Sequence, residues 1–232
     1  MIMEYHNPVL LKETVNGLNI KEDGVYVDVT FGGGGHSKEI LKRLGEKGRL
    51  FAFDQDLDAL KNAIDDERFV LINENFRFIK RFLRFHGIKQ VDGILADLGV
   101  SSHQFDVAER GFSTRFDAEL DMRMNQKAEL SAKKLVNEYS EEDLYRVFRM
   151  YGEVSNTGKL VRTIMDARVS TPINTTGELT AVIEKCAPKH KELDIDFHTC
   201  QCPQSLRGFR NPEGLCSVCS KLFPNKIVRK EK

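Results

Sequence analysis

The apolar positions of residues 24–98 recur with two alternating periods. Short apolar, β-branched runs are typical of buried strands, and apolar side chains three or four positions apart are typical of helices. We expect strands at residues 24–30, 49–54, 69–73 and 91–98, and helices at residues 37–44, 57–64 and 76–86. Gly45 and Gly87 follow two of these helices, where glycine commonly caps the last turn. Strands and helices in this alternation predict an α/β fold with a parallel sheet.

The pattern changes after residue 104. Residues 105–130 are polar with scattered phenylalanine and methionine, and residues 131–186 have helical spacing almost throughout. Ser140 before three acidic residues, and Thr176 before Glu178, are typical of helix starts. The predicted parts of the chain are a sheet domain over residues 1–104, a helical subdomain over residues 105–190 and a tail over residues 191–232.

The tail shows neither period and holds four of the five cysteines. The pairs Cys200 with Cys202 and Cys216 with Cys219 have a spacing that can supply four thiolates to a tetrahedral zinc ion. His198 is a spare ligand for the same ion. Spacing alone leaves a metal knuckle open as one interpretation of this segment.

Composition limits how the chain can meet its partners. Its 232 residues are enough for one well-buried domain and a smaller one. With 35 basic and 35 acidic side chains, the chain has no net charge that would draw it onto nucleic acid, so any such binding needs a local patch. No apolar run approaches the roughly 20 residues of a membrane span, and the first residues lack a signal-peptide layout. We expect a cytoplasmic protein with reduced cysteines.

Residues 30–37 (TFGGGGHS) place four glycines between a predicted strand and a predicted helix. Glycines there let a ligand approach the backbone closely and leave amide groups free at the positive end of a helix. Gly32 and Gly34 fit the dinucleotide pattern G-x-G-x-x-G, but Ser37 occupies the place of the third glycine, which weakens a pyrophosphate interpretation. No Gly-Lys-Ser/Thr follows, so the loop is not a phosphate-binding P-loop.

Asp54 ends the second predicted strand, 22 residues after Gly32. An acidic residue at this point can bind both hydroxyls of a ribose, which nicotinamide cofactors and S-adenosylmethionine share. The alternative is a glycine-rich turn without a ligand. Phe76 follows the third strand, where its ring can cover an adenine or simply belong to the core.

Residues 92–104 (DGILADLGVSSHQ) resemble the signature of the RsmH (MraW) family, the bacterial 16S rRNA (cytosine-N4)-methyltransferases. The resemblance extends from residue 4 to about residue 190. Its other blocks are HNPVLL at 6–11, the glycine loop at 30–37, RGFS at 110–113, LDMRM at 120–124 and YGE at 151–153.

This resemblance implies a Rossmann-like class I methyltransferase sheet that binds S-adenosylmethionine and carries a helical insertion. The cofactor contacts that it implies are Gly34, Gly35, His36, Asp54, Phe76, Asp97 and Gln104. By itself His36 would be interpreted as a helix-capping histidine. The implied partner is 16S rRNA in the small ribosomal subunit, and the sequence leaves a monomer and a homodimer equally open.

The implied reaction is attack by N4 of a cytidine on the sulfonium methyl group, and it requires no metal. Asp97 is the candidate catalytic residue, since it ends a parallel strand where ligands of open sheets bind. It can accept a hydrogen bond from the cytidine amine, or instead contact the amino group of the cofactor. Ser101 and Ser102 follow and are interpreted as turn residues.

Two groups of cations are candidates for binding RNA. Arg110, Arg115 and Arg123 follow the Asp97 loop, and we expect them to contact phosphates. A second group lies in the helix predicted at residues 76–86, interleaved with phenylalanines, and is interpreted as a solvated helix face: Arg77, Lys80, Arg81 and Arg84.

In the family the chain returns to the sheet after the helical region, but here only residues 211–214 and 226–230 resemble that return. We interpret the tail as a damaged reading frame with four free thiols, and expect it to leave an exposed edge beside the fourth strand. The alternatives are a catalytically impaired member, a metal-stapled binding protein without catalysis, and a nicotinamide-dependent oxidoreductase.

Overall fold

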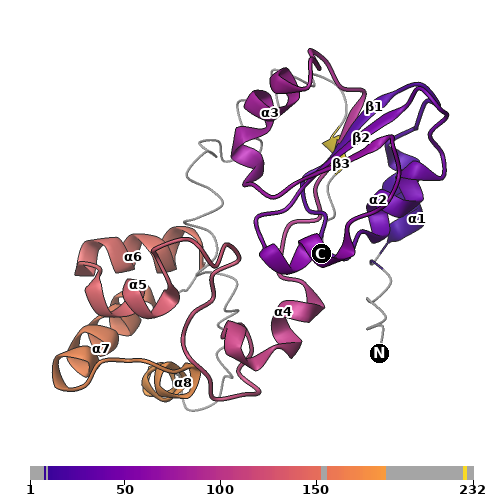
Figure 1. The fold of residues 1–232 in the computed structure, drawn as a ribbon. Helices are drawn as coiled ribbons and strands as arrows, with labels where there is room; N and C mark the ends of the chain where they lie inside the picture. The colour runs from indigo at the N-terminus through magenta and orange to yellow at the C-terminus, as the bar shows by residue number, and fades with distance from the viewer. Residues whose placement is uncertain (1–7, 9, 153–155, 187–226, 229–232) are drawn as a thin grey trace. The chain divides into compact units, whose positions relative to one another are not determined.

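The computed structural model describes residues 8, 10–152, 156–186 and 227–228. The chain divides into two compact units, and the division falls between Gly99 and Val100 (Figure 1). The first unit contains the sheet and the second contains the helical region. The division lies five residues before the expected end of the sheet domain at Gln104. None of the described helices is long and apolar enough to cross a membrane.

The first unit is built on a five-stranded sheet in the order β3-β2-β1-β4-β5, in which every neighbouring pair is parallel. This order, which reverses direction beside β1, is that of a Rossmann-like sheet and confirms the predicted α/β fold. Its strands are β1 (Val25–Asp28), β2 (Arg49–Phe53), β3 (Phe69–Ile72), β4 (Gly93–Leu95) and β5 (Ile227–Val228).

The edge of the sheet beside β4 is paired, so the expectation of an exposed edge there was wrong. Ile227 pairs with Ile94 and Val228 with Leu95 in a parallel register. An unpaired strand presents a row of main-chain hydrogen-bonding groups, and pairing with β5 satisfies those of β4. Both β5 residues come from the short segment at 226–230 in which the family pattern reappears.

The helical segments of the first unit are short. The helix α1 (Leu11–Gly17) precedes the sheet and was not predicted. The segments between strands are α2 (Gly35–Leu41), η1 (Leu57–Asn62), η2 (Phe76–Phe78) and α3 (Ile79–Phe85), where η denotes a 3₁₀ helix. The helix expected at residues 57–64 is therefore a 3₁₀ helix, capped by the side chain of Asp56. Gly87 follows α3 with a φ of 75° as expected, whereas Gly45 lies beyond α2 and its amide donates to Glu22 O.

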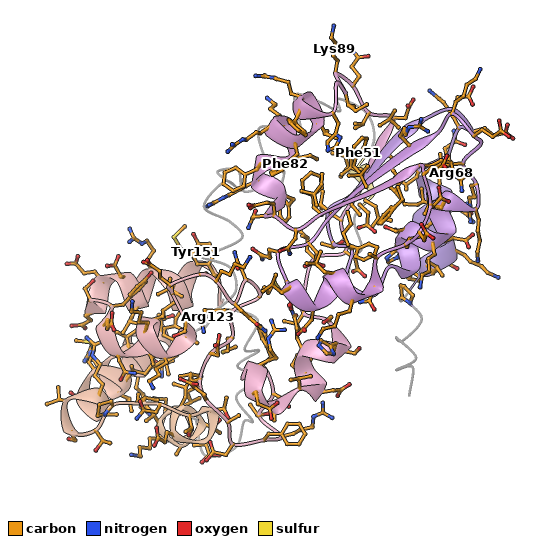
Figure 2. The ribbon with its side chains drawn as sticks, viewed as in Figure 1. Phe51, Arg68, Phe82, Lys89, Arg123 and Tyr151 are labelled. Carbon is orange, nitrogen blue, oxygen red and sulfur yellow. The ribbon has the colours of Figure 1, made fainter. Side chains whose placement is uncertain are left out.

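Both faces of the sheet are covered by apolar side chains. On one face Val27 and Phe51 pack with Ile79 and Leu83 of α3. The Phe82 ring of the same helix meets Phe53 edge-on, with 6.1 Å between the ring centroids; Figure 2 labels Phe51 and Phe82. Residues of α1 and α2 form the core of the other face with Tyr26, Leu50 and Leu95.

The second unit is helical, as predicted for residues 131–186. Its elements are α4 (Ser102–Asp106), η3 (Ala108–Arg110), α5 (Ala132–Glu138), α6 (Glu141–Met150), α7 (Thr157–Ser170) and α8 (Thr176–Glu184). Ser140 caps α6 through a bond from Asp143 N, as expected. The cap of α8 is Thr175 rather than Thr176, because Thr175 and Glu178 form a capping box.

The loop between η3 and α5 is held to this helical core by its backbone. Leu120 is fully buried, and its amide donates to Asn174 O at 2.9 Å. Gly111 has a φ of 69°, and a Cβ built on it would lie 2.9 Å from Asp121 N and overlap Glu119 O. Glycine is therefore required at position 111 both for the backbone conformation and for the close passage of the loop.

We expect Gly111→Ala to lower the free energy of unfolding by about 1–3 kcal/mol or more. Both the left-handed backbone at position 111 and the close passage of Glu119 and Asp121 disfavour a side chain there. Gly158→Ala is the matched control. Gly158 lies within α7, and no described atom lies within 4 Å of the position that its Cβ would take, so the change is expected to be neutral or stabilising by up to about 1 kcal/mol. Urea denaturation followed by circular dichroism measures both. Equal urea midpoints for Gly111→Ala and the unchanged protein would refute the claim that position 111 requires glycine.

Candidate cofactor site at the carboxyl edge of the sheet

The parallel strands of the first unit end at one edge, and polar residues follow each end there. Asp28 ends β1, Asp54 follows β2, Asn73 follows β3 and Asp97 follows β4. The segments stay bonded beyond the strands, since Val29 N donates to Leu95 O at 2.9 Å. Ligands of open parallel sheets bind at this edge, beside the point where the strand order reverses.

Asp28 has no exposed surface and holds both ends of the glycine loop. Its Oδ1 accepts a hydrogen bond from Thr30 N at 3.0 Å, and its Oδ2 accepts one from Ser37 Oγ at 2.7 Å. Ser37 is also fully buried. The serine in the place of the third glycine of the dinucleotide pattern is thus the partner of a buried carboxyl group.

Sequence reasoning assigned Asp28 and Ser37 no part in the site. Their separation of nine residues fits no helical or strand period, so only the fold of the loop shows that they meet. The available signal was an acidic residue at the end of an otherwise apolar strand, the same signal that singled out Asp97.

Burial raises the pKa of Asp28 to about 6, although the hydrogen bonds from Ser37 and Thr30 oppose this rise. A buried carboxylate loses its hydration, and two hydrogen bonds restore only part of it. The group therefore titrates between the acidic range and neutrality.

Asp54 anchors the middle of the glycine loop from β2. Its Oδ2 accepts from Gly32 N at 2.8 Å and its Oδ1 from Asp56 N at 2.9 Å. Asn62 Nδ2 donates to Gly32 O at 3.0 Å, so both main-chain groups of Gly32 are bonded. Burial raises the pKa of Asp54. Each carboxylate oxygen can accept a second hydrogen bond, so this arrangement leaves acceptor capacity for a ligand.

The loop conformation requires glycine at two positions. Gly32 and Gly34 have φ values of 51° and 77°, and Gly34 is the N-cap of α2. A Cβ on Gly34 would come within 3.0 Å of the Phe31 ring, and one on Gly35 would overlap Pro8. A Cβ added to Gly32 would have no described atom within 4 Å, so the loop is open to a ligand on that side as far as the described residues show.

The end of β3 is joined to the end of β2 by amide side chains. Asn73 Nδ2 donates to Asp54 O at 2.9 Å, and the buried Asn75 donates to Gln55 Oε1 at 2.9 Å. Asn75 Oδ1 also accepts from Arg77 N and so caps η2, which begins at Phe76. Phe76 is half-buried against the core of the sheet, which keeps its ring at this edge.

Asp97 is placed by the same loop. Its amide donates to Thr30 Oγ1 at 2.8 Å, and Thr30 is in turn bonded to Asp28. The side chain of Asp97 is half-buried. His36 lies in the first turn of α2 and is 5% exposed. Gly34 is the N-cap of that helix, so His36 is not its capping residue.

The first unit therefore brings together all the cofactor residues predicted within it: Gly34, Gly35, His36, Asp54, Phe76 and Asp97. Gln104 belongs to the second unit. Gln104 is buried. Its side-chain Oε1 accepts from Ser101 N, and its main-chain N donates to Ser101 Oγ, so the two residues form the capping box of α4. This confirms a local backbone role for Ser101 and leaves the cofactor contact of Gln104 a prediction.

The three arginines predicted to bind phosphates have different surroundings in the second unit. Arg110 is 6% exposed and donates to Arg123 O at 2.9 Å. Arg123, labelled in Figure 2, forms a two-bonded ion pair with Asp121 and donates to Ala128 O at 2.8 Å. Arg115 is paired with Asp106 on the surface. The structure gives Arg110 and Arg123 partners in their own loop, and among the three it favours Arg115 for a phosphate.

The zinc interpretation of the tail concerns Cys200, Cys202, Cys216 and Cys219, which lie outside the described residues. Within the described part of the chain no cluster of three or more histidine, cysteine or acidic residues could hold a metal ion. Cys186, the described cysteine, is a buried free thiol.

Comparison with known proteins gives consistent matches. A model of the MraW methylase family matches residues 3–217, which extends past residue 190 into the tail. The chain is 74% identical over 187 residues to the ribosomal RNA small subunit methyltransferase H of Flavobacterium johnsoniae, covering 81% of this chain and 62% of that protein. The protein of the same name from Christiangramia forsetii is 64% identical over 84% of this chain and 65% of its own length. The one from Bacteroides thetaiotaomicron is 56% identical over 82% of this chain and 62% of its own length. The chain thus spans less than two thirds of the length of these relatives.

The raised pKa of Asp28 predicts how stability depends on pH. The folded chain holds this proton up to about pH 6, while the unfolded chain releases it near the ordinary value of 3.8. The free energy of unfolding should therefore fall as pH rises from about 4 to 6, by an amount on the order of 3 kcal/mol. Asp28→Asn should remove the part of this fall that Asp28 causes, because a carboxamide does not titrate; the raised pKa of Asp54 contributes a separate fall in the same direction. The carboxamide keeps an acceptor for Thr30 N and offers a donor to Ser37 Oγ, so the loop should remain bonded.

Urea denaturation between pH 4 and pH 7 measures this dependence. Asp66→Asn is the control, because Arg68 holds the pKa of Asp66 at about 2 and that group does not titrate in this window. A fall in stability that persists unchanged in Asp28→Asn would show that the buried carboxyl group is not its source.

Proposed function

The chain belongs to the MraW methylase family, and we propose that it is an S-adenosylmethionine-dependent methyltransferase that methylates N4 of a cytidine in the decoding region of 16S rRNA. The observation that carries this proposal is the carboxyl edge of the sheet, where the glycine loop, Asp54 and Asp97 are joined by hydrogen bonds. The names of the relatives, which describe small-subunit rRNA methyltransferases, support the substrate class.

The residues at this edge fit the cofactor chemically. Asp54 keeps acceptor capacity for the two ribose hydroxyls after binding Gly32 N and Asp56 N. Phe76 presents a half-buried ring suited to an adenine, and the loop is open beside Gly32. Gly34, Gly35 and His36 would contact the amino-acid end of the cofactor. Gln104, from the second unit, is included through the family resemblance.

An observation in the loop favours this cofactor over a dinucleotide. In the dinucleotide pattern the third glycine allows a helix to pack closely on a strand. Here Ser37 occupies that position, is fully buried, and binds Asp28. The loop is therefore built around a buried carboxyl–hydroxyl pair rather than around the packing that the dinucleotide pattern requires.

When bound, S-adenosylmethionine would supply an electrophilic methyl group on its sulfonium. The amine of cytidine is a weak nucleophile because its lone pair is delocalised into the ring. Asp97 would accept a hydrogen bond from that amine, localise the lone pair, and help to orient it. The bond from its amide to Thr30 Oγ1 fixes the backbone at this position. The alternative is that Asp97 binds the amino group of the cofactor.

The proposed partner is 16S rRNA in the small ribosomal subunit, which would place the protein in the cytoplasm. A base paired in a stem would have to be flipped out to reach the edge of the sheet. Arg110, Arg115 and Arg123 are proposed to contact RNA. Arg115 carries most of this proposal, because its side chain is 62% exposed.

We expect Asp54→Ala to weaken S-adenosylmethionine binding by about 2–4 kcal/mol, because two charge-assisted hydrogen bonds to the ribose would be lost. Asp54→Asn, which keeps one acceptor oxygen, should weaken it less. Asp65→Asn, an exposed acidic residue on the same unit, is the control and should leave the affinity unchanged. Isothermal titration calorimetry with S-adenosylmethionine, and separately with NAD, provides the measurement. Unchanged affinity in a folded Asp54→Ala protein, or binding of NAD alone, would refute the cofactor assignment.

We expect Asp97→Asn to abolish methyl transfer to small ribosomal subunits, because a carboxamide is a much weaker acceptor for the cytidine amine. If Asp97 acts on the amine, affinity for S-adenosylmethionine is retained, and a parallel loss of that affinity assigns Asp97 to the cofactor. Asp92→Asn is a control at the opposite end of β4, where Asp92 pairs with Lys21.

The measurement is tritium transfer from labelled cofactor followed by nucleoside analysis. Label in DNA, in protein or in another RNA base, with none at cytidine N4, would contradict the proposed substrate.

A further inference from the structure

The segment from Asn75 to Val91, which contains α3, is strongly basic. It has no acidic residue and five cations, although acidic and basic residues are equal in number over the whole chain. The cations are Arg77, Lys80, Arg81, Arg84 and Lys89. Figure 2 shows Lys89 at the end of this segment, pointing away from the sheet. The local positive patch that a neutral chain needs for binding nucleic acid is therefore present here.

These cations are exposed, and their charge is not neutralised by any described residue. Arg77, Lys80, Arg81 and Arg84 are all exposed, and none forms an ion pair with a described acidic residue. Elsewhere in the chain, by contrast, Arg43 is paired with Glu39 and Arg68 with Asp66. A solvated helix face usually mixes charges of both signs, so an all-positive face calls for a partner of opposite charge.

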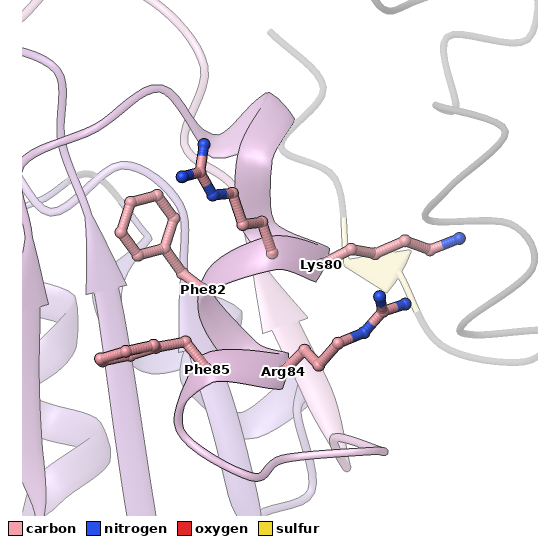
Figure 3. A pocket seen from close by; sticks show the side chains of 5 residues that line it. Lys80, Phe82, Arg84 and Phe85 are labelled. Atoms are coloured by element: carbon pink, nitrogen blue, oxygen red, sulfur yellow. The ribbon is translucent and has the colours of Figure 1, made fainter.

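An aromatic strip borders the cations on the same helix. Lys80, Arg81, Phe82, Arg84 and Phe85 together line a hollow on the surface of α3. In Figure 3 the rings of Phe82 and Phe85 point to one side of α3, and Lys80 and Arg84 point to the other. Phe85 is 84% exposed, so its ring is open to a ligand as far as the described residues show.

Helix geometry makes this arrangement continuous. At 3.6 residues per turn, Arg81 lies between Arg84 and Phe85 around the helix, so the cationic strip passes directly into the aromatic one. Just before α3, the guanidinium carbon of Arg77 lies 4.5 Å from the centroid of the Phe78 ring. Arg77 follows Phe76 of the candidate cofactor site, so the strip begins at that edge of the sheet.

We propose that this face of α3 binds single-stranded RNA, with phosphates on Lys80, Arg81 and Arg84 and a base stacked on Phe85. Single-stranded nucleic acids are bound by a positive surface that follows the backbone beside aromatic rings that stack on bases. An acidic peptide would use the cations but leave the exposed ring without a matching partner. The identity of the partner rests on the proposed rRNA substrate, and the face would guide the strand that carries the target cytidine.

The test is fluorescence anisotropy with the full chain and a labelled single-stranded RNA of about 12 nucleotides, titrated at several salt concentrations. Replacing Lys80, Arg81 and Arg84 together by glutamine should weaken binding roughly tenfold or more at low salt. Loss of three phosphate contacts should also reduce the slope of log affinity against log salt by about 2. The matched control replaces Lys12, Lys42 and Lys47, which are exposed cations of the same unit, by glutamine and should bind like the unchanged protein.

A second variant separates stacking from charge. Phe85→Ala should weaken RNA binding roughly 5- to 150-fold and leave the salt dependence unchanged, because a stacked ring contributes without a charge. Phe85→Trp should restore binding. Since Phe85 is almost fully exposed, neither change is expected to affect folding.

The proposal is overturned if the unchanged chain does not bind the RNA, or if the variant of Lys80, Arg81 and Arg84 binds the RNA as tightly as the unchanged chain. It is also overturned if this variant and the control triple variant lose affinity for the RNA to the same extent. Tighter binding of a polyglutamate peptide than of RNA would identify an acidic protein as the partner and would also overturn it. Calorimetry with S-adenosylmethionine on the same proteins separates this inference from the proposed function. If the chain binds RNA through α3 but does not bind S-adenosylmethionine, the proposed function is refuted and the proposal that α3 binds RNA is supported.

Discussion

A carboxyl group without exposed surface holds the glycine loop at both of its ends. Asp28 accepts hydrogen bonds from Thr30 at the start of the loop and from Ser37 in the first turn of α2. Burying such a group is costly unless its oxygens are bonded, so the loop conformation that supplies both bonds is strongly favoured. Thr30 then carries the constraint to β4, because its hydroxyl accepts from Asp97 N. The ends of β1 and β4 and the start of α2 are thereby fixed relative to one another.

In the proposed function, the side chain of Asp54 would have both a structural and a ligand-binding role. Asp54 accepts hydrogen bonds from Gly32 N and Asp56 N, and the proposed ribose contact would use lone pairs that these bonds leave. Burial raises the pKa of both Asp28 and Asp54, which means that the fold keeps two carboxyl groups in surroundings that disfavour their charge. Conflicts of this kind are expected at functional sites, where stability is given up for a defined geometry.

Sequence reasoning reached the sheet, the glycines and Asp54 because each depends on local spacing. It identified Ser37 only as a departure from the dinucleotide pattern, because its bond to Asp28 depends on the three-dimensional course of the loop. Arg110 and Arg123 were chosen by their place in the chain, and burial and ion pairing, which sequence does not reveal, give them partners in their own loop. The strand at Ile227–Val228 was missed because two residues are too few to show a period.

Hydrogen exchange measured by mass spectrometry, on the full chain with and without S-adenosylmethionine, tests most directly whether this carboxyl-held loop is the cofactor site. Direct contact predicts slower exchange in peptides that cover residues 30–37, 54–56 and 96–98, while the peptides of α5 to α7 exchange at unchanged rates. The amides of Gly35, His36 and Ser37 should respond most, because they form the first turn of α2 and lack partners within that helix. Unchanged exchange across residues 30–37 at saturating cofactor, or equal protection of that segment by NAD, would contradict the account.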